Sequence, residues 1–177
     1  YDCVKKKNYD YAMELLCMAL EQDPSFFECR MALRAAQMKK HENAGRLAKM
    51  AAATTTAHHF MQAKLALRKK NNFGALVHAE KILCADPENS SGHRVIVDAS
   101  KSLDYPQTLI SSLQLLKRVN PKDNSLTQAL ADALEMLGDS DQAEEVMAQL
   151  SRMNPDDIYL QQAYRDTAAK ATIYRGG

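Results

Sequence analysis

Apolar positions recur with a helical period through most of the chain, and the pattern is clearest in residues 130–155. Apolar residues spaced three and four apart form one stripe before Gly138-Asp139 and a second stripe after it, and the segment stops at Pro155. This spacing places apolar side chains on one face of a helix, whereas Gly and Pro interrupt helices. The segment is therefore predicted to be two amphipathic helices joined by a short turn.

The same arrangement recurs along the chain, and prolines mark its period. Pro87, Pro121 and Pro155 follow one another at intervals of 34 residues, and each comes directly after Asp or Asn. Pro24 also follows Asp, but it precedes Pro87 by 63 residues, which is five short of two periods. Proline ends a helix because it restricts the residue before it and has no amide hydrogen to donate. A fixed period of this length predicts a repeat architecture.

Small residues and potential helix caps accompany the prolines. Alanine stands twelve residues before three of the four prolines, at positions 12, 75 and 143, and Leu109 takes that place before Pro121. A small side chain there would let the two helices of a hairpin approach closely. Polar residues that can cap the next helix follow the prolines, namely Ser25, Asn89, Asp123 and Asp156.

About ten helices are expected from this pattern. They span residues 9–22, 25–39, 42–53, 56–70, 73–85, 88–102, 106–119, 123–137, 140–152 and 156–173. Residues 54–56 are three threonines in the place of the Asp-Pro stop. Because β-branched residues with hydroxyls are poor in helix interiors and good as caps, we expect a shortened linker there and a new helix from near Ala57.

The whole pattern resembles the tetratricopeptide repeat family, and residues 124–157 match it best. The matching residues are Leu130, Ala131, Leu134, Leu137, Gly138, Asp139, Ala143, Met147 and Pro155. After Pro87, the family's large-small-large set is replaced by His93, Ile96, Val97 and Ser100. The resemblance implies an all-α fold, a right-handed α-solenoid of antiparallel helix hairpins, as a single domain over residues 1–177. Its units would be about 1–24, 25–56, 57–87, 88–121, 122–155 and a half unit at 156–177.

Both end units lack a helix, and the chain begins with Tyr1. We therefore expect a fragment of a longer protein. Since cut solenoid ends expose apolar faces, we also expect one end to pack on a neighbouring segment, on a crystal neighbour or on another copy of the chain, which would be self-association.

Composition and charge favour a helical protein without a nucleic-acid or membrane role. Good helix formers are plentiful, whereas the 177 residues include only 6 Gly and 5 Pro. The net charge of +1 gives no global attraction for nucleic acids or anionic membranes. Residues 1–88 carry a net charge of +4 and residues 89–177 a net charge of −3. No apolar run reaches the roughly 18 residues of a membrane span, and no signal peptide is visible.

The four cysteines are interpreted as reduced residues, which favours a cytoplasmic location. No pair has CxxC spacing, and Cys17, Cys29 and Cys84 lie within apolar helical patterns, whereas Cys3 lies near the start of the chain. In such patterns a free cysteine acts as a small hydrophobic side chain. Disulfides or metal ligation are the alternative.

No residue pattern predicts catalysis, a cofactor or a metal. Phosphate-binding glycine loops, nucleophile elbows and zinc-binding HExxH motifs are absent. His58 and His59 are adjacent, so they point about 100° apart on a helix, and a metal site would require other ligands from distant positions. The carboxylate pair Asp132 and Glu135 shares a helix face, but acid–base catalysis would require a dry cleft around it. The chain is predicted not to be an enzyme.

The resemblance directs attention to the concave surface, which first helices line in tetratricopeptide arrays and where partner peptides or helices bind. The groove residues carried over are Met31, Met38, Phe60, Arg94, Asp98, Lys101, Gln128, Asp132 and Glu135. The family's clamp for C-terminal carboxylates is not supported, because acidic residues alternate with Arg94 and Lys101. Methionine adapts to irregular partners, although core filling explains Met31 and Met38 equally well.

These observations lead to three hypotheses of function. The first is a non-enzymatic scaffold that binds a peptide or helix of a partner protein in the groove. The second is a structural spacer or self-assembly segment of a larger repeat protein. The third is a helical-repeat nucleic-acid binder that uses the basic clusters at residues 5–7, 39–40 and 68–70, although cations at helix ends are also explained by the helix dipole.

Overall fold

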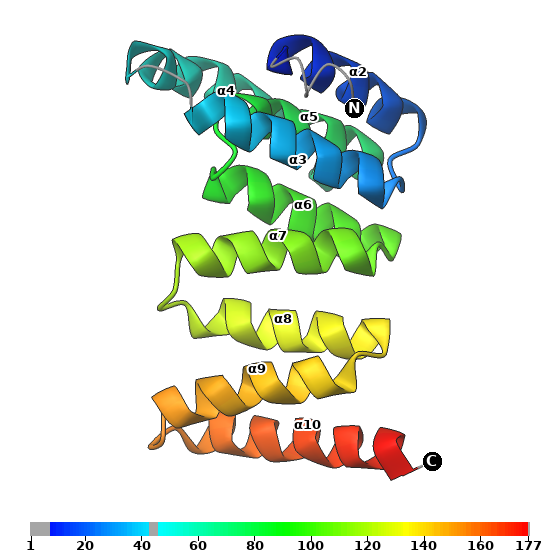
Figure 1. Ribbon diagram of the computed structural model, residues 1–177, viewed down its shortest axis with the longest axis vertical. Coiled ribbons are helices and arrows are strands. Elements are labelled where there is room, and N and C mark those ends of the chain that lie inside the picture. Colours follow the sequence, from blue (N-terminus) through cyan, green and yellow to red (C-terminus); the bar gives the residue numbers. More distant parts are fainter. Residues whose placement is uncertain (1–7, 43–45, 177) are drawn as a thin grey trace. The chain divides into compact units, whose positions relative to one another are not determined.

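The computed structural model describes residues 8–42 and 46–176, and for residues 46–55 it describes the backbone only. Within these residues the chain forms helices and no strands (Figure 1). The helices are α2 (Tyr9–Gln22), α3 (Phe27–Glu42), α4 (Arg46–Arg68), α5 (Asn72–Ala85), α6 (Ser90–Leu103), α7 (Pro106–Val119), α8 (Asn124–Leu137), α9 (Ser140–Met153) and α10 (Ile158–Gly176). The predicted all-α class is confirmed.

The predicted helix boundaries agree with the structure to within three residues except around α4. Helices α2 and α7 begin and end where the sequence pattern predicted. Helix α7 starts with Pro106, whose missing amide hydrogen costs nothing in the first turn. The pattern works because proline and the polar residues around it end one helix and begin the next.

Side-chain caps explain why the helices start where they do. The side-chain oxygens of Asn89 and Asp123 accept backbone N–H groups of α6 and α8, as predicted. Asp156 was the wrong choice for α10, because Asp157 accepts from the backbone amides of Tyr159 and Leu160 instead. Ser25 hydrogen-bonds to the Asp23 carboxylate before α3 begins. Each cap satisfies an amide that the first turn leaves unpaired.

The predicted break at residues 54–56 is wrong. One helix, α4, runs without interruption from Arg46 to Arg68 and replaces the predicted helices 42–53 and 56–70. Neither Gly nor Pro lies between Arg46 and Arg68. Threonine costs only a few tenths of a kcal/mol relative to alanine in a helix, and alanines stand on both sides of the triplet. These residues therefore lack a signal strong enough to end the helix, and the expected linker does not form.

The chain divides into two compact units, residues 1–108 and 109–177, with the boundary inside α7. In the N-terminal unit, α5 is the central helix, because α2, α3, α4 and α6 all pack against it. Ala75 is fully buried in the cluster that α4, α5 and α6 share, as its small size suggested. His93, Ile96 and Ser100, which replace the usual large-small-large set, are also fully buried.

The C-terminal unit contains the regular hairpin from which the period was recognised. Helix α9 packs against α8 on one side and α10 on the other. Gly138 ends α8 with φ +86°, a left-handed conformation that glycine adopts without steric cost. Its larger buried apolar side chains are Leu109, Ile110, Leu113, Leu116, Leu126, Leu130, Leu134, Met147, Leu150 and Leu160. Ala143 is fully buried, which fits the close approach expected at the hairpin.

Candidate protein-binding face

The predicted groove residues fall into both units. Met31 and Met38 lie on α3, Phe60 on α4 and Arg94, Asp98 and Lys101 on α6, all in the N-terminal unit. Gln128, Asp132 and Glu135 lie on α8 in the C-terminal unit.

In the N-terminal unit, the predicted residues divide between core and surface. Phe60 is half-buried against the α4–α6 core, and Lys64 Nζ lies 5.6 Å from its ring centroid. Met38 is half-buried and Met31 is exposed. Residues 94, 98 and 101 are exposed on α6, where spacings of four and three place them on one helix face. This unit therefore presents a polar face on α6.

In the C-terminal unit, the structure joins the predicted α8 residues to residues of α10. Lys170 Nζ on α10 lies 2.7 Å from Glu135 Oε2 on α8. The hydrogen bond and charge of Glu135, and then the charges of Asp132 and Asp166, raise the pKa of Lys170 above its ordinary value. Gln162 Nε2 donates to Asp166 Oδ1 at 2.8 Å. Glu135 thus contacts the ammonium group of Lys170, and the charges of Asp132 and Asp166 act on it as well.

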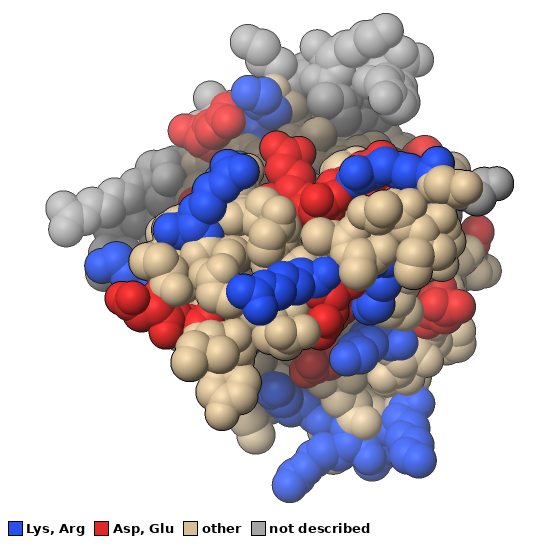
Figure 2. All heavy atoms as spheres, turned by 90° about the horizontal axis from the view of Figure 1, so that it is seen from below, with Lys and Arg blue, Asp and Glu red and all other residues tan. Residues whose placement is uncertain are grey.

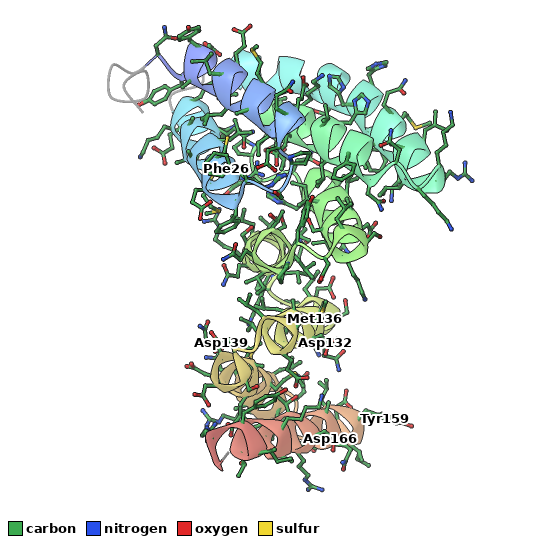
Figure 3. The ribbon with its side chains drawn as sticks, turned by 90° about the vertical axis from the view of Figure 1, so that its right-hand side faces the viewer. Phe26, Asp132, Met136, Asp139, Tyr159 and Asp166 are labelled. Atoms are coloured by element: carbon green, nitrogen blue, oxygen red, sulfur yellow. The ribbon has the colours of Figure 1, made fainter. Side chains whose placement is uncertain are left out.

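Apolar side chains accompany these charges. Met136 on α8 is 55% exposed and Tyr159 on α10 is 88% exposed. Figure 3 labels both of them together with Asp132 and Asp166. We call the resulting surface the α8–α10 face; its members are Gln128, Asp132, Glu135, Met136, Tyr159, Gln162, Asp166 and Lys170. It combines an excess of negative charge with uncovered apolar area, the combination that suits a basic, partly apolar segment.

The sequence interpretation missed the α10 members of this face. The period contains the signal that would have found them, because positions 162 and 166 stand 34 residues after Gln128 and Asp132. Treating residues 156–177 only as an incomplete unit hid this equivalence. Lys170 interrupts the acidic pattern, and the sequence alone does not reveal that it pairs with Glu135.

A buried polar network occupies the interior of the N-terminal unit. Arg34 Nη2 lies 3.1 Å from Glu80 Oε2, and Arg30 Nη1 lies 3.5 Å from Glu80 Oε1. All three side chains are less than a tenth exposed. Burial lowers the pKa of Arg30, and the charge of Glu80 opposes that effect. Because the ions pair with one another inside the unit, the network is a structural feature.

The structure brings together two histidines that are distant in sequence. His59 Nδ1 and His78 Nδ1 lie 3.3 Å apart. Burial lowers the pKa of both side chains, and the nearby Lys81 adds to this effect. No group of three or more His, Cys, Asp or Glu side chains suited to a metal occurs within the described residues.

Neither an internal cavity nor a long apolar helix suggests another class of function. A cavity of about 10 Å³ lies between Cys17, Arg30 and Glu80, which is room for about one water molecule. Among the residues that the structure describes, no helix is both long and apolar enough to cross a lipid bilayer.

Antiparallel helix hairpins with a 34-residue period and buried alanines at the helix contacts define an α-helical repeat protein. Residues 110–166 match a family profile described as tetratricopeptide repeat. This segment belongs to the tetratricopeptide repeat family, and the fold of the chain is that of a protein of this family, which confirms the resemblance seen in the sequence.

A solved structure supports the fold. The chain is similar to a thermophilic TPR protein of Thermus thermophilus, with a TM-score of 0.50 and 18% sequence identity, over 95% of this chain and 94% of that one. At this identity the similarity shows the fold alone. No curated protein matches the chain.

Proposed function

We propose that the chain is a non-enzymatic protein-binding module whose α8–α10 face holds a segment of a partner protein. Tetratricopeptide repeats generally mediate protein–protein contact, and residues 110–166, which carry the family match, contain all of this face except Lys170. The observation that carries the proposal is the contact of Lys170 on α10 with Glu135 on α8, together with the charges of Asp132 and Asp166 that act on the same ammonium group.

The partner segment is basic and amphipathic. Three carboxylates against one ammonium leave the face negatively charged, so Lys or Arg side chains of a partner would replace weak solvent contacts with ion pairs. Met136 and Tyr159 offer apolar area beside the charges. Methionine adapts to irregular partners and tyrosine offers a rigid ring with a polar end. An extended peptide or an amphipathic helix with apolar and basic residues on one side fits this chemistry.

Selection from a displayed peptide library tests the proposal. The 177-residue chain is immobilised, and bound peptides are sequenced, synthesised and titrated by fluorescence anisotropy. Recovered peptides are expected to be rich in Lys and Arg. The double variant Asp132→Lys/Asp166→Lys should bind them at least about tenfold more weakly, because it reverses the charge of the face. Raising the salt concentration should weaken binding to the original chain.

A matched double variant separates local from global charge. Glu14→Lys/Glu145→Lys changes the net charge equally at two exposed positions outside the α8–α10 face, and its affinity should stay within about twofold of the original, because distant exposed charges are screened by salt. Recovery of neutral or acidic peptides, or equal binding by both double variants, would exclude this face as the binding site.

Exposed apolar residues of α10 favour self-assembly as a second candidate function. Ile158, Ile173 and Tyr174 are 80%, 74% and 74% exposed. Figure 2, seen from the side on which α10 lies in Figure 1, shows acidic and basic side chains interspersed with uncharged surface. Sedimentation velocity of the Ile173→Ser/Tyr174→Ser variant tests this candidate. Self-association that the variant lacks would support it, whereas a monomeric original chain would contradict it.

A further inference from the structure

Two cysteines that are far apart in sequence meet in the N-terminal unit. Cys17 lies on α2 and Cys84 on α5, 67 positions later. Their Sγ atoms are 3.8 Å apart, whereas a disulfide bond is about 2.05 Å long. The two sulfur atoms are therefore not bonded in this structure, and closing the bond requires them to approach by less than the width of one atom. Neither side chain is fully buried.

The surroundings make the two thiols unequal. Gln37 Nε2 donates to Cys84 Sγ at 3.2 Å. The hydrogen bond from Cys17 and that from Gln37, together with the positive charge of Arg34, lower the pKa of Cys84 against the effect of burial. The pKa of Cys17 is raised by its contact with Cys84, by burial and by the charges of Glu80 and Glu21. Cys84 is thus the better nucleophile and Cys17 the thiol that follows.

We propose that Cys17 and Cys84 are an oxidation site at which hydroperoxides form a reversible disulfide bond between α2 and α5. The proposal rests on the sulfur–sulfur distance, on the amide donor at Cys84 and on the access that both half-buried side chains retain. Cys29, which lies in the same core cluster, is buried and donates its S–H to the backbone oxygen of Leu16. It is therefore excluded from the reacting pair.

The reaction proceeds in two steps. The Cys84 thiolate attacks the terminal peroxide oxygen, the O–O bond breaks, and hydroxide, or the alkoxide of an organic hydroperoxide, leaves while Cys84 becomes a sulfenic acid. The sulfur of Cys17 then attacks the sulfur of Cys84, the S–O bond breaks, and the departing hydroxide takes the proton of Cys17 to form water. Two thiols are oxidised and one hydroperoxide is reduced.

The bond would fasten one helix to the central helix of its unit. Helix α2 packs against α3 and α5, and the disulfide would add a covalent link between α2 and α5. Because it would close a long loop, it would restrict the unfolded chain. Oxidation would thus stabilise the N-terminal unit, and a reducing thiol would reverse the effect.

Hydrogen peroxide treatment of the full chain, followed by peptide mapping without reduction, tests the site. Trypsin leaves Cys17 and Cys29 together in residues 8–30 and Cys84 in residues 82–94. A second cleavage after Glu21 separates the first two cysteines. The expected product links the Cys17 peptide to the Cys84 peptide. Before digestion, the oxidised chain should have a melting temperature about 5–10 °C higher than that of the reduced chain. Dithiothreitol should restore the original value.

Single variants test the order of the two steps. Cys17→Ser should leave a sulfenic acid on Cys84 that dimedone traps, whereas Cys84→Ser should give much slower modification of Cys17. Cys29→Ser is the matched control and should form the same linkage as the original chain. Circular dichroism of each variant confirms that it is folded. The proposal would be overturned if Cys17 and Cys84 remain free thiols after peroxide treatment, or if the linkage uses Cys3 or Cys29 instead. Both results come from the original chain, so they hold even if a variant fails to fold.

Discussion

The two units of the chain build helix hairpins around different interiors. The buried polar side chains of the N-terminal unit include charged and basic groups, namely Arg30, Arg34, Glu80 and His93. Those of the C-terminal unit, within the residues described, are all hydroxyls, namely Ser112, Thr127, Ser140, Ser151 and Thr167. The ion pair that joins α8 to α10 is instead on the surface, between Glu135 and Lys170.

This difference follows the regularity of the repeats. The C-terminal unit keeps the 34-residue period and contains all of residues 110–166, which match the tetratricopeptide repeat profile. The N-terminal unit lacks five residues of the period and has the continuous α4 in place of two helices. In this unit, α3 and α5 are joined by buried ion pairs in addition to the apolar clusters around them. The comparison implies that removing one partner of a buried charge pair should destabilise the N-terminal unit, whereas the described residues of the C-terminal unit include no buried charged side chain to be left unpaired.

The largest expected effect comes from removing the shared carboxylate of the buried network. Glu80→Ala would leave Arg30 and Arg34 buried without their counterion, and we expect a loss of about 3–5 kcal/mol in the free energy of unfolding. Urea unfolding measures the loss, and hydrogen exchange should locate it in the N-terminal unit. The triple variant Arg30→Met/Arg34→Leu/Glu80→Leu should recover most of it, because no buried charge remains. A loss below about 1 kcal/mol in Glu80→Ala would show that the network is hydrated.

A smaller effect is expected from pH, because acid should destabilise the N-terminal unit more than the C-terminal unit. Burial, helped by the charge of Arg34, lowers the pKa of His93 to about 4. The unfolded chain takes up this proton near pH 6.5 whereas the folded chain does not, so stability is retained above about 6.5 and lost as the pH falls toward 4. Between about pH 7 and pH 5 the N-terminal unit should lose about 2 kcal/mol. The lowered pKa values of His59 and His78 add to the loss.

The C-terminal unit provides the internal comparison for this prediction, because residues 109–177 contain no histidine. Hydrogen exchange at the two pH values, corrected for the intrinsic exchange rate, should show weaker protection in the N-terminal unit alone. His93→Gln should reduce the pH dependence. Equal losses in both units would contradict the assignment to histidine.

Alanine substitutions at two glycines, one in each unit, should have smaller effects with different causes. A Cβ added at Gly92 would lie 3.0 Å from Ile82 Cγ2 and from Leu83 Cδ2, so Gly92→Ala should cost about 1–3 kcal/mol through overpacking of the N-terminal unit. A Cβ at Gly138 has open space, but its φ of +86° is strained for alanine, so Gly138→Ala should cost about 1 kcal/mol. Thermal unfolding measures both. Asparagine, which tolerates the left-handed region, should be the better substitute at Gly138 and the worse one at Gly92.

The sequence predicts the regular parts of the molecule because few residues decide them. Pro155 and Gly138 stop helices, and Asn89 and Asp123 begin them, through local effects that distant parts of the chain do not change. The continuity of α4 was missed because its threonine triplet weakens a helix without ending it. Local pattern therefore predicts boundaries well where Gly, Pro or a cap acts, and poorly where only propensity does.

Pairings across helices could not be predicted in the same way. Arg30 and Arg34 have the spacing of a solvated helix face, and only the packing of α3 on α5 brings them to Glu80. The contact of Cys17 with Cys84 has the same origin. For the candidate binding face, the period could indicate which α10 positions correspond to those of α8. The geometry of the Glu135–Lys170 pair depends on side-chain conformations that no period encodes.

The smallest expected effect concerns that surface pair. Lys170 and Glu135 have side chains that are 56% and 20% exposed, so water and salt screen their attraction, and the coupling free energy should be below about 1 kcal/mol. A double-mutant cycle of Lys170→Ala and Glu135→Ala, followed by urea unfolding, measures it. Lys170→Ala should also bind basic peptides more tightly than the original chain in a fluorescence anisotropy titration, because it removes the one cation of the α8–α10 face and leaves its three carboxylates. A coupling free energy as large as the loss of about 3–5 kcal/mol expected for Glu80→Ala would mean that the α8–α10 face is rigid and poorly hydrated. The contrast between the buried charges of the N-terminal unit and the hydrated charges of the α8–α10 face would then fail.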